Sequence, residues 1–120
     1  MEHRMQWTQE GLIEQIIDGT KTATVRRVEW SEGYDDLNTP LHVGMTYRVH
    51  DREGRERCRV RITAIELARW GAIPERLWRE DPAMSGEVSL DAFKGDHYDF
   101  FDQPDDDFEF LAIHFERIDG

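Results

Sequence analysis

The feature that most constrains the fold of this chain is a change of periodicity at Gly19. Before it, apolar residues between positions 12 and 17 recur at the spacing of one helix face, and glycine is common just past a helix end. After it, β-branched and basic residues alternate as they do in a strand. The sequence therefore predicts a helix that turns directly into a strand carrying Lys21, Thr24 and Arg26. These donors could bind an anionic or carbonyl-bearing ligand, or could equally be ordinary charges on a solvated strand.

The rest of the chain contains short elements of both kinds, with no repeat or linker that would divide its 120 residues. Several strands with few helices favour a single α+β domain, residues 1–120, around a curved sheet or small barrel. Expected strands cover residues 22–30, 45–50, 56–65 and 108–118. Expected helices cover about residues 9–18, with Thr8 as N-cap, a short segment from Pro74 through Arg79, and another that Ser89 caps and that runs to about residue 99.

The eight residues from Gly19 to Arg26 read Gly-Thr-Lys-Thr-Ala-Thr-Val-Arg, which resembles the signature motif of the ASCH family in the PUA-like superfamily. The resemblance implies a PUA-like small β-barrel with flanking short helices. Further segments that are similar to the family, in the same order, are Val43–Val49, Val60–Glu66, Gly86–Leu90 with His97 beyond it, and Phe110–Phe115.

Some bacterial ASCH proteins are amidohydrolases that act on N4-acylated cytidine, and the resemblance implies catalytic roles for Lys21 and Thr24. A hydroxyl attacks only when a base takes its proton, and a lysine serves as that base when burial or a neighbouring cation disfavours its charge. Arg26, on the same strand face as Thr24, could supply that cation. The family's acidic residue falls on Ser85, so the nearest carboxylate, Glu87, is the expected third member. The alternative is that Lys21 caps helix carbonyls and Thr24 only favours the strand.

Three arginines spaced by two, Arg57, Arg59 and Arg61, should share one face of a strand and could bind phosphate oxygens. Alternatively, the three arginines form ion pairs with acidic residues on a solvent-exposed face. Trp30 is a candidate for stacking on a base. His97 matches a family histidine and is expected to line the cleft or to pack its helix.

The net charge of −11 argues against general nucleic-acid binding, which needs clustered positive charge. The excess lies in residues 66–120, with five Lys and Arg against fifteen Asp and Glu, whereas residues 1–65 have ten against eleven. The first half could still bind a short polyanion. The chain has a single cysteine, Cys58, and no metal-ligand spacing, so the sequence predicts no metal and no cofactor. No apolar run approaches 20 residues, so it also predicts no membrane segment. These features favour a cytoplasmic location.

These patterns lead to three hypotheses. The first is an ASCH-domain protein that binds RNA or a nucleoside in a cleft lined by the motif. The second is an amidohydrolase for N4-acetylcytidine-type nucleosides. The third is a ribonuclease, although no pair of histidines is placed in the sequence to act as acid and base.

Overall fold

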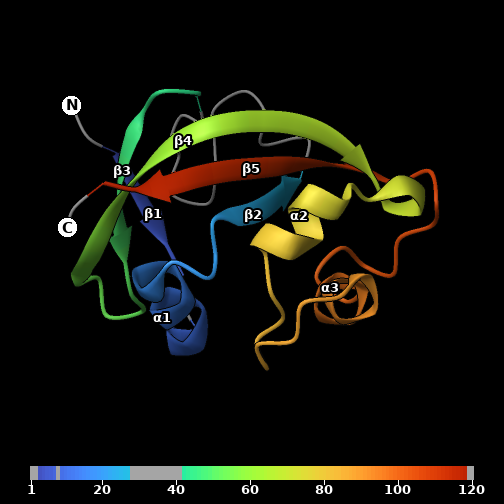
Figure 1. The fold of residues 1–120 in the computed structure, drawn as a ribbon, viewed down its shortest axis with the longest axis horizontal. Coiled ribbons are helices and arrows are strands. Elements are labelled where there is room, and N and C mark those ends of the chain that lie inside the picture. Colours follow the sequence, from blue (N-terminus) through green and yellow to red (C-terminus); the bar gives the residue numbers. More distant parts are fainter. Residues whose placement is uncertain (1–2, 8, 28–41, 119–120) are drawn as a thin grey trace.

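The computed structural model describes residues 3–7, 9–27 and 42–118, which form one curled sheet with short helices beneath it (Figure 1). The strands are β1 (His3–Gln6), β2 (Ala23–Arg27), β3 (Thr46–His50), β4 (Glu56–Arg69) and β5 (Glu109–Arg117). The helices are α1 (Glu10–Asp18), α2 (Glu75–Glu80) and α3 (Leu90–His97), with a 3-10 turn, η2 (Trp70–Ala72), after β4. The predicted α+β class is confirmed.

The sheet has the strand order β1-β3-β4-β5-β2. β1 runs parallel to β3, and every other neighbouring pair is antiparallel. The long strands β4 and β5 pair along most of their length and bend together, and the register shifts between Ile62 and Ala64 (Figure 1). Because bulges of this kind increase strand bending, the sheet curls into a half-barrel, which agrees with the expected small barrel.

The turn at Gly19 ends α1 as the sequence predicts. Gly19 has φ 88°, a left-handed conformation that glycine adopts without steric cost, and its N–H donates to Ile16 O. On the face of α1 toward the sheet, Ile13 and Ile16 are buried in a core that includes Cys58. The N-cap is Gln9 without a side-chain hydrogen bond, and Thr8 lies outside the described residues.

A second core lies under the other end of the sheet, where α2 and α3 pack (Figure 1). Leu77 of α2 and Phe93 of α3 are buried there against Phe110 of β5. The predicted cap of α3 is confirmed, because Ser89 Oγ accepts a 3.0 Å hydrogen bond from the Ala92 N–H. β2 leads out of the Gly19 turn, runs between α1 and α2, and contributes Ala23 and Val25 to this second core (Figure 1).

The sequence patterns missed β1. Its four residues include no β-branched or aromatic side chain, and its parallel pairing with β3 is a long-range contact that local patterns do not reveal. β4 also continues past the predicted end at residue 65, to Arg69. Within the described ranges, no helix is long and apolar enough to cross a membrane.

Candidate functional site

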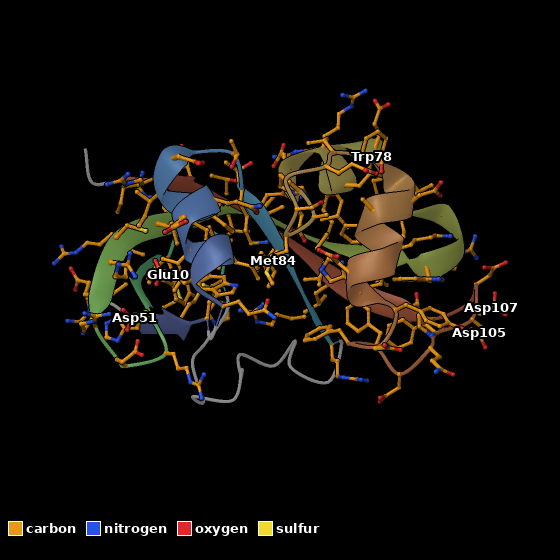
Figure 2. The ribbon with its side chains drawn as sticks, turned by 90° about the horizontal axis from the view of Figure 1, so that it is seen from below. Glu10, Asp51, Trp78, Met84, Asp105 and Asp107 are labelled. Carbon is orange, nitrogen blue, oxygen red and sulfur yellow. The ribbon has the colours of Figure 1, made fainter. Side chains whose placement is uncertain are left out.

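A cavity of about 500 Å³ opens where the Gly19 junction faces the segment between α2 and α3. Figure 2 shows Met84, one of its lining residues, between α1 and α3. This volume lies in the range of small-molecule sites. Its polar lining residues are Gln9, Lys21, Thr24, Arg26, Asp81, Asp96 and His97. Its apolar lining residues are Trp7, Leu12, Val25, Pro82, Met84 and Phe100.

A buried ion pair lies on the wall of this cavity. Lys21 Nζ donates to Asp81 Oδ1 at 2.5 Å and to the Ala23 carbonyl at 2.7 Å. The two side chains are only 3% and 2% exposed. A backbone hydrogen bond from Thr22 N to Glu80 O, 2.8 Å, places the residue after α2 beside Lys21. The Lys21 ammonium therefore contacts a carboxylate in the cavity wall, not the helix carbonyls of the alternative interpretation.

Thr24 and Arg26 lie side by side on β2, and both are buried. Arg26 Nη1 donates to Thr24 Oγ1 at 3.1 Å and to the Val25 carbonyl at 2.8 Å. The guanidinium group also lies over the Trp7 ring, 5.6 Å from its centroid. A cation that donates to a hydroxyl oxygen stabilises negative charge on that oxygen, so Arg26 favours ionisation of Thr24.

The structure corrects the expected position of the acidic residue. Glu87 is exposed, does not line the cavity, and accepts a 2.7 Å hydrogen bond from the Ser89 hydroxyl. The turn at Gly86, with φ 93°, reverses the chain so that Glu87 pairs with the backbone of Ala83. The carboxylate beside Lys21 is Asp81. A sequence signal existed, because Asp81 lies just beyond the short helix expected from Pro74 to Arg79 and precedes a proline, as helix-terminating residues often do.

His97 reaches the cavity from the end of α3. Its Nδ1 lies 2.8 Å from the Phe93 carbonyl oxygen, and its Nε2 lies 3.5 Å from Asp81 Oδ2. The ring lies tilted against that of Phe93, with centroids 4.3 Å apart and an interplanar angle of 32°. Its neighbour Asp96 accepts a 2.8 Å hydrogen bond from the Met84 N–H. Both expectations for His97, lining the cleft and packing the helix, describe what it does.

Glu80, the residue before Asp81 in the chain, is held by two further side chains. His114 Nδ1 of β5 lies 2.8 Å from Glu80 Oε1, and Arg76 Nε donates to Glu80 Oε2 at 2.9 Å. Burial raises the pKa of Glu80, but the hydrogen bonds and charges of His114 and Arg76 outweigh burial and lower it overall. The contact between Glu80 and His114 joins the end of α2 to β5 of the sheet. The sequence analysis did not predict this contact.

The arginine row lies away from the cavity. Arg57 donates to Glu10 at 2.6 Å, which raises its pKa above the usual range. Figure 2 shows Glu10 on the side of α1 away from α3. The other two row members pair with acids, Arg59 with Glu56 at 3.6 Å and Arg61 with Glu116 at 3.3 Å. As predicted, the row alternates with buried Cys58, Val60 and Ile62. None of the three arginines lines the cavity, so the structure does not join the row to Lys21.

Two further expectations concern base stacking by Trp30 and metal binding. Trp30, the candidate for base stacking, lies outside the described residues. Among residues 3–7, 9–27 and 42–118, no group of three or more His, Cys, Asp or Glu side chains could hold a metal ion. The aromatic residues that do line the cavity are Trp7 and Phe100.

A family model described as the ASCH domain matches residues 3–119. No curated protein shows significant sequence similarity to the chain. Similar solved structures include the ASCH domain from Lactobacillus crispatus JV V101, with a TM-score of 0.75 and 20% identity, over 90% of this chain and 70% of that one. They also include a protein from Enterococcus faecalis V583, with a TM-score of 0.66 and 16% identity, over 99% and 82% of the two chains. A third is a mutant of ZmASCH from Zymomonas mobilis, with a TM-score of 0.60 and 15% identity, over 98% and 75%. At these identities the similarity shows the fold alone.

Proposed function

The chain belongs to the ASCH domain family, and from that premise and its cavity we propose that it binds a nucleoside with an acylated exocyclic amine and hydrolyses the amide. The observation that carries this proposal is that the buried Lys21–Asp81 pair lines the same cavity as Thr24 and Arg26. In this pair Asp81 provides the carboxylate that the family motif would place at Ser85. The nearest family activity is the deacylation of N4-acetylcytidine.

In the proposed reaction Thr24 Oγ1 attacks the carbonyl carbon of the amide. Its proton passes to Lys21 Nζ, which must first have released a proton because its ammonium donates to Asp81. Arg26 donates to Oγ1 and so favours the loss of its proton, and the negative charge passes to the carbonyl oxygen as the new C–O bond forms. The C–N bond then breaks, Lys21 returns the proton to the leaving amine, and water hydrolyses the ester on Thr24.

The lining of the cavity suits a nucleoside. Trp7 and Phe100 provide aromatic surface at the cavity wall, and stacking of a base on such a ring is worth about 1–3 kcal/mol. Gln9 and Asp96 offer hydrogen-bonding groups to the polar edges of a base or ribose. A volume of about 500 Å³ accommodates one nucleoside and does not require a polymer.

The direct test is to measure the conversion of N4-acetylcytidine to cytidine by chromatography. Thr24→Ala should remove the activity, because one half of a nucleophile–base pair cannot work without the other. Thr63→Ala, at an exposed position on β4, is the matched control and should keep the wild-type rate. Glu87→Gln should also keep it. A Thr24→Ala protein that turns over at the wild-type rate would remove Thr24 from the reaction.

A second candidate is binding of a nucleoside without turnover. The observation that favours it is that Lys21 already donates to Asp81 and to a carbonyl, which holds it as an ammonium that accepts no proton. Cytidine that binds at the cavity, with no conversion of acylated cytidine by the wild-type protein, would select this candidate.

Two further possibilities have less support. A ribonuclease that uses two histidines as acid and base would need a second one, and His97 is the one histidine among the described residues that lines the cavity. A short RNA footprint on the row of Arg57, Arg59 and Arg61 would have to compete with carboxylates that already pair with these side chains.

A further inference from the structure

The two oxygens of the Asp81 carboxylate have unlike surroundings. Oδ1 accepts the short hydrogen bond from Lys21. Oδ2 is fully buried and accepts no hydrogen bond from the described residues. A buried carboxylate oxygen without a donor is costly, because it has lost water and gained nothing in return. The polar atom that faces it is Nε2 of His97, at 3.5 Å.

The other nitrogen of the His97 ring determines what Nε2 can offer. Nδ1 lies 2.8 Å from the Phe93 carbonyl oxygen, and since a carbonyl only accepts, Nδ1 carries a hydrogen. A neutral ring would then present a bare lone pair at Nε2 to the lone pairs of Asp81 Oδ2. Two acceptors that face each other out of water repel. A hydrogen on Nε2 replaces this repulsion with a charge-assisted hydrogen bond after a small shift of either side chain.

We propose that His97 and Asp81 share a proton between Nε2 and Oδ2, so that the Asp81 carboxylate is held between two cations. Lys21 neutralises it through Oδ1 and the His97 imidazolium through Oδ2. The close contact of the ring with Phe93, 4.3 Å between centroids, also favours a charged ring, because the face of an aromatic ring attracts cations.

The consequence for catalysis rests on the proposed amide hydrolysis. If Lys21 alone neutralised Asp81, release of its proton would leave a buried carboxylate with no compensating charge. With His97 charged, Asp81 is shared between two cations and attracts the Lys21 ammonium less strongly, so Lys21 releases a proton more readily than it would beside an unshared carboxylate. The neutral amine then accepts the Thr24 proton as Oγ1 bonds to the carbonyl carbon. His97 is thus a positioning residue that acts through Asp81.

The other charged groups of the cavity are engaged elsewhere. Asp96, the neighbour of His97 in sequence, is exposed and its carboxylate accepts from the Met84 N–H. Arg26 donates to Thr24 and to a carbonyl on β2. Besides Phe93, the rings packed on His97 are Phe100 and Phe101, which carry no charge. The titration of His97 should therefore depend mainly on Asp81 and, through it, on Lys21.

The proposed proton between His97 Nε2 and Asp81 Oδ2 is tested by nuclear magnetic resonance of the histidine ring nitrogens as pH is varied. In the wild-type protein the His97 ring should lose its second proton at higher pH than exposed His42, which serves as internal reference. Asp81→Asn should lower the His97 midpoint by about 1 unit or more, since an opposite charge within hydrogen-bonding range shifts titration by that much. The His42 midpoint should not move. A wild-type His97 midpoint at or below that of His42 would overturn the shared proton, whatever the enzymatic result.

The catalytic use of the proton is tested with His97→Gln, which keeps a neutral donor and removes the charge. We expect kcat to fall on the order of tenfold with KM nearly unchanged, and hydrolysis to set in at higher pH, because Lys21 then releases its proton less readily. His42→Gln is the control. A pH–rate profile of His97→Gln equal to that of wild type would refute the catalytic use. If no variant or wild-type protein hydrolyses the substrate, the proposed function fails, and the ring titration still decides the proton.

Discussion

Two groups of basic side chains in this molecule have the same charge and opposite surroundings. Lys21 and Arg26 are buried at the α1–β2 junction and line a cavity. Arg59 and Arg61 are roughly half exposed on β4 and pair with glutamates at the surface. From the sequence both groups were candidates for ligand binding. The difference shows that burial and direction, not charge, distinguish a site from a solvated face.

The cause lies in the positions of the two strands. β2 is covered on both faces, so the side chains of Thr24 and Arg26 are desolvated and must find partners within the cavity wall. β4 alternates buried and accessible residues, so one of its faces stays in water. Ion pairs in water contribute only about 0–1 kcal/mol, whereas breaking a buried pair is strongly destabilising.

The largest expected effect is on stability at the buried pair. Lys21→Met should lower the free energy of unfolding by about 3–5 kcal/mol, because the buried Asp81 carboxylate loses its short hydrogen bond and the cation at Oδ1. Arg61→Met, which removes an exposed partner of Glu116, should change it by less than about 1 kcal/mol. Urea denaturation measures both. Lys21→Met combined with Asp81→Leu should recover most of the loss, and equal losses in the two single variants would contradict the comparison.

The next effect is on catalysis. Arg26→Lys should reduce kcat for N4-acetylcytidine about 100-fold, since a lysine cannot reproduce the fork that donates to Thr24 Oγ1. The triple change of Arg57, Arg59 and Arg61 to alanine should leave kcat/KM within about twofold, because these residues lie outside the cavity. Steady-state kinetics at one pH suffices. A triple variant as impaired as Arg26→Lys would place the row in the site.

A smaller effect concerns the backbone of the junction. Gly19→Ala should cost about 1 kcal/mol, since φ 88° is a left-handed conformation that a Cβ disfavours. Gly95→Ala, inside α3 with open space for a Cβ and no left-handed strain, should instead stabilise by about 0.5–1 kcal/mol. Thermal unfolding of the two variants measures the contrast. Changes of the same sign would mean that the turn at Gly19 does not constrain the junction.

The smallest effect is a dependence on pH. The folded pKa of Glu80 is lowered, so its contribution to stability is present above the unfolded value, near pH 4.3, and is lost as pH falls toward the folded one. Glu80→Gln should therefore flatten the decline in the urea midpoint between pH 5 and pH 3. Asp51, whose pKa is also lowered despite its burial, is the comparator in the β3–β4 hairpin. Asp51→Asn should flatten the same range without altering the His97 ring titration.

Local features of the site were predictable from sequence. The helix end at Gly19 and the alternation around Cys58 depend on neighbours within a few residues, and both were predicted correctly. The ASCH resemblance likewise identified Lys21 and Thr24 as candidates, and the structure brings both to one cavity. Their chemical roles remain predictions.

Long-range features were not predictable. Asp81 arrives beside Lys21 because the Thr22 N–H pairs with the Glu80 carbonyl, a contact between segments far apart in the chain. The choice of Glu87 failed because nearness in sequence to the motif position was taken for nearness in space. β1 was missed for the same reason, since its pairing with β3 crosses the whole of α1 and β2.

The most direct test of the central claim, that the cavity at the α1–β2 junction is the ligand site, is a titration of the ¹⁵N-labelled protein with cytidine. Amide signals of residues 21–26, of Asp81, Ala83 and Met84, and of residues 96–100 should shift together and saturate. Those of Arg57, Arg59 and Arg61 should not move. Shifts confined to the β4 row, or no shift at millimolar cytidine, would contradict the account.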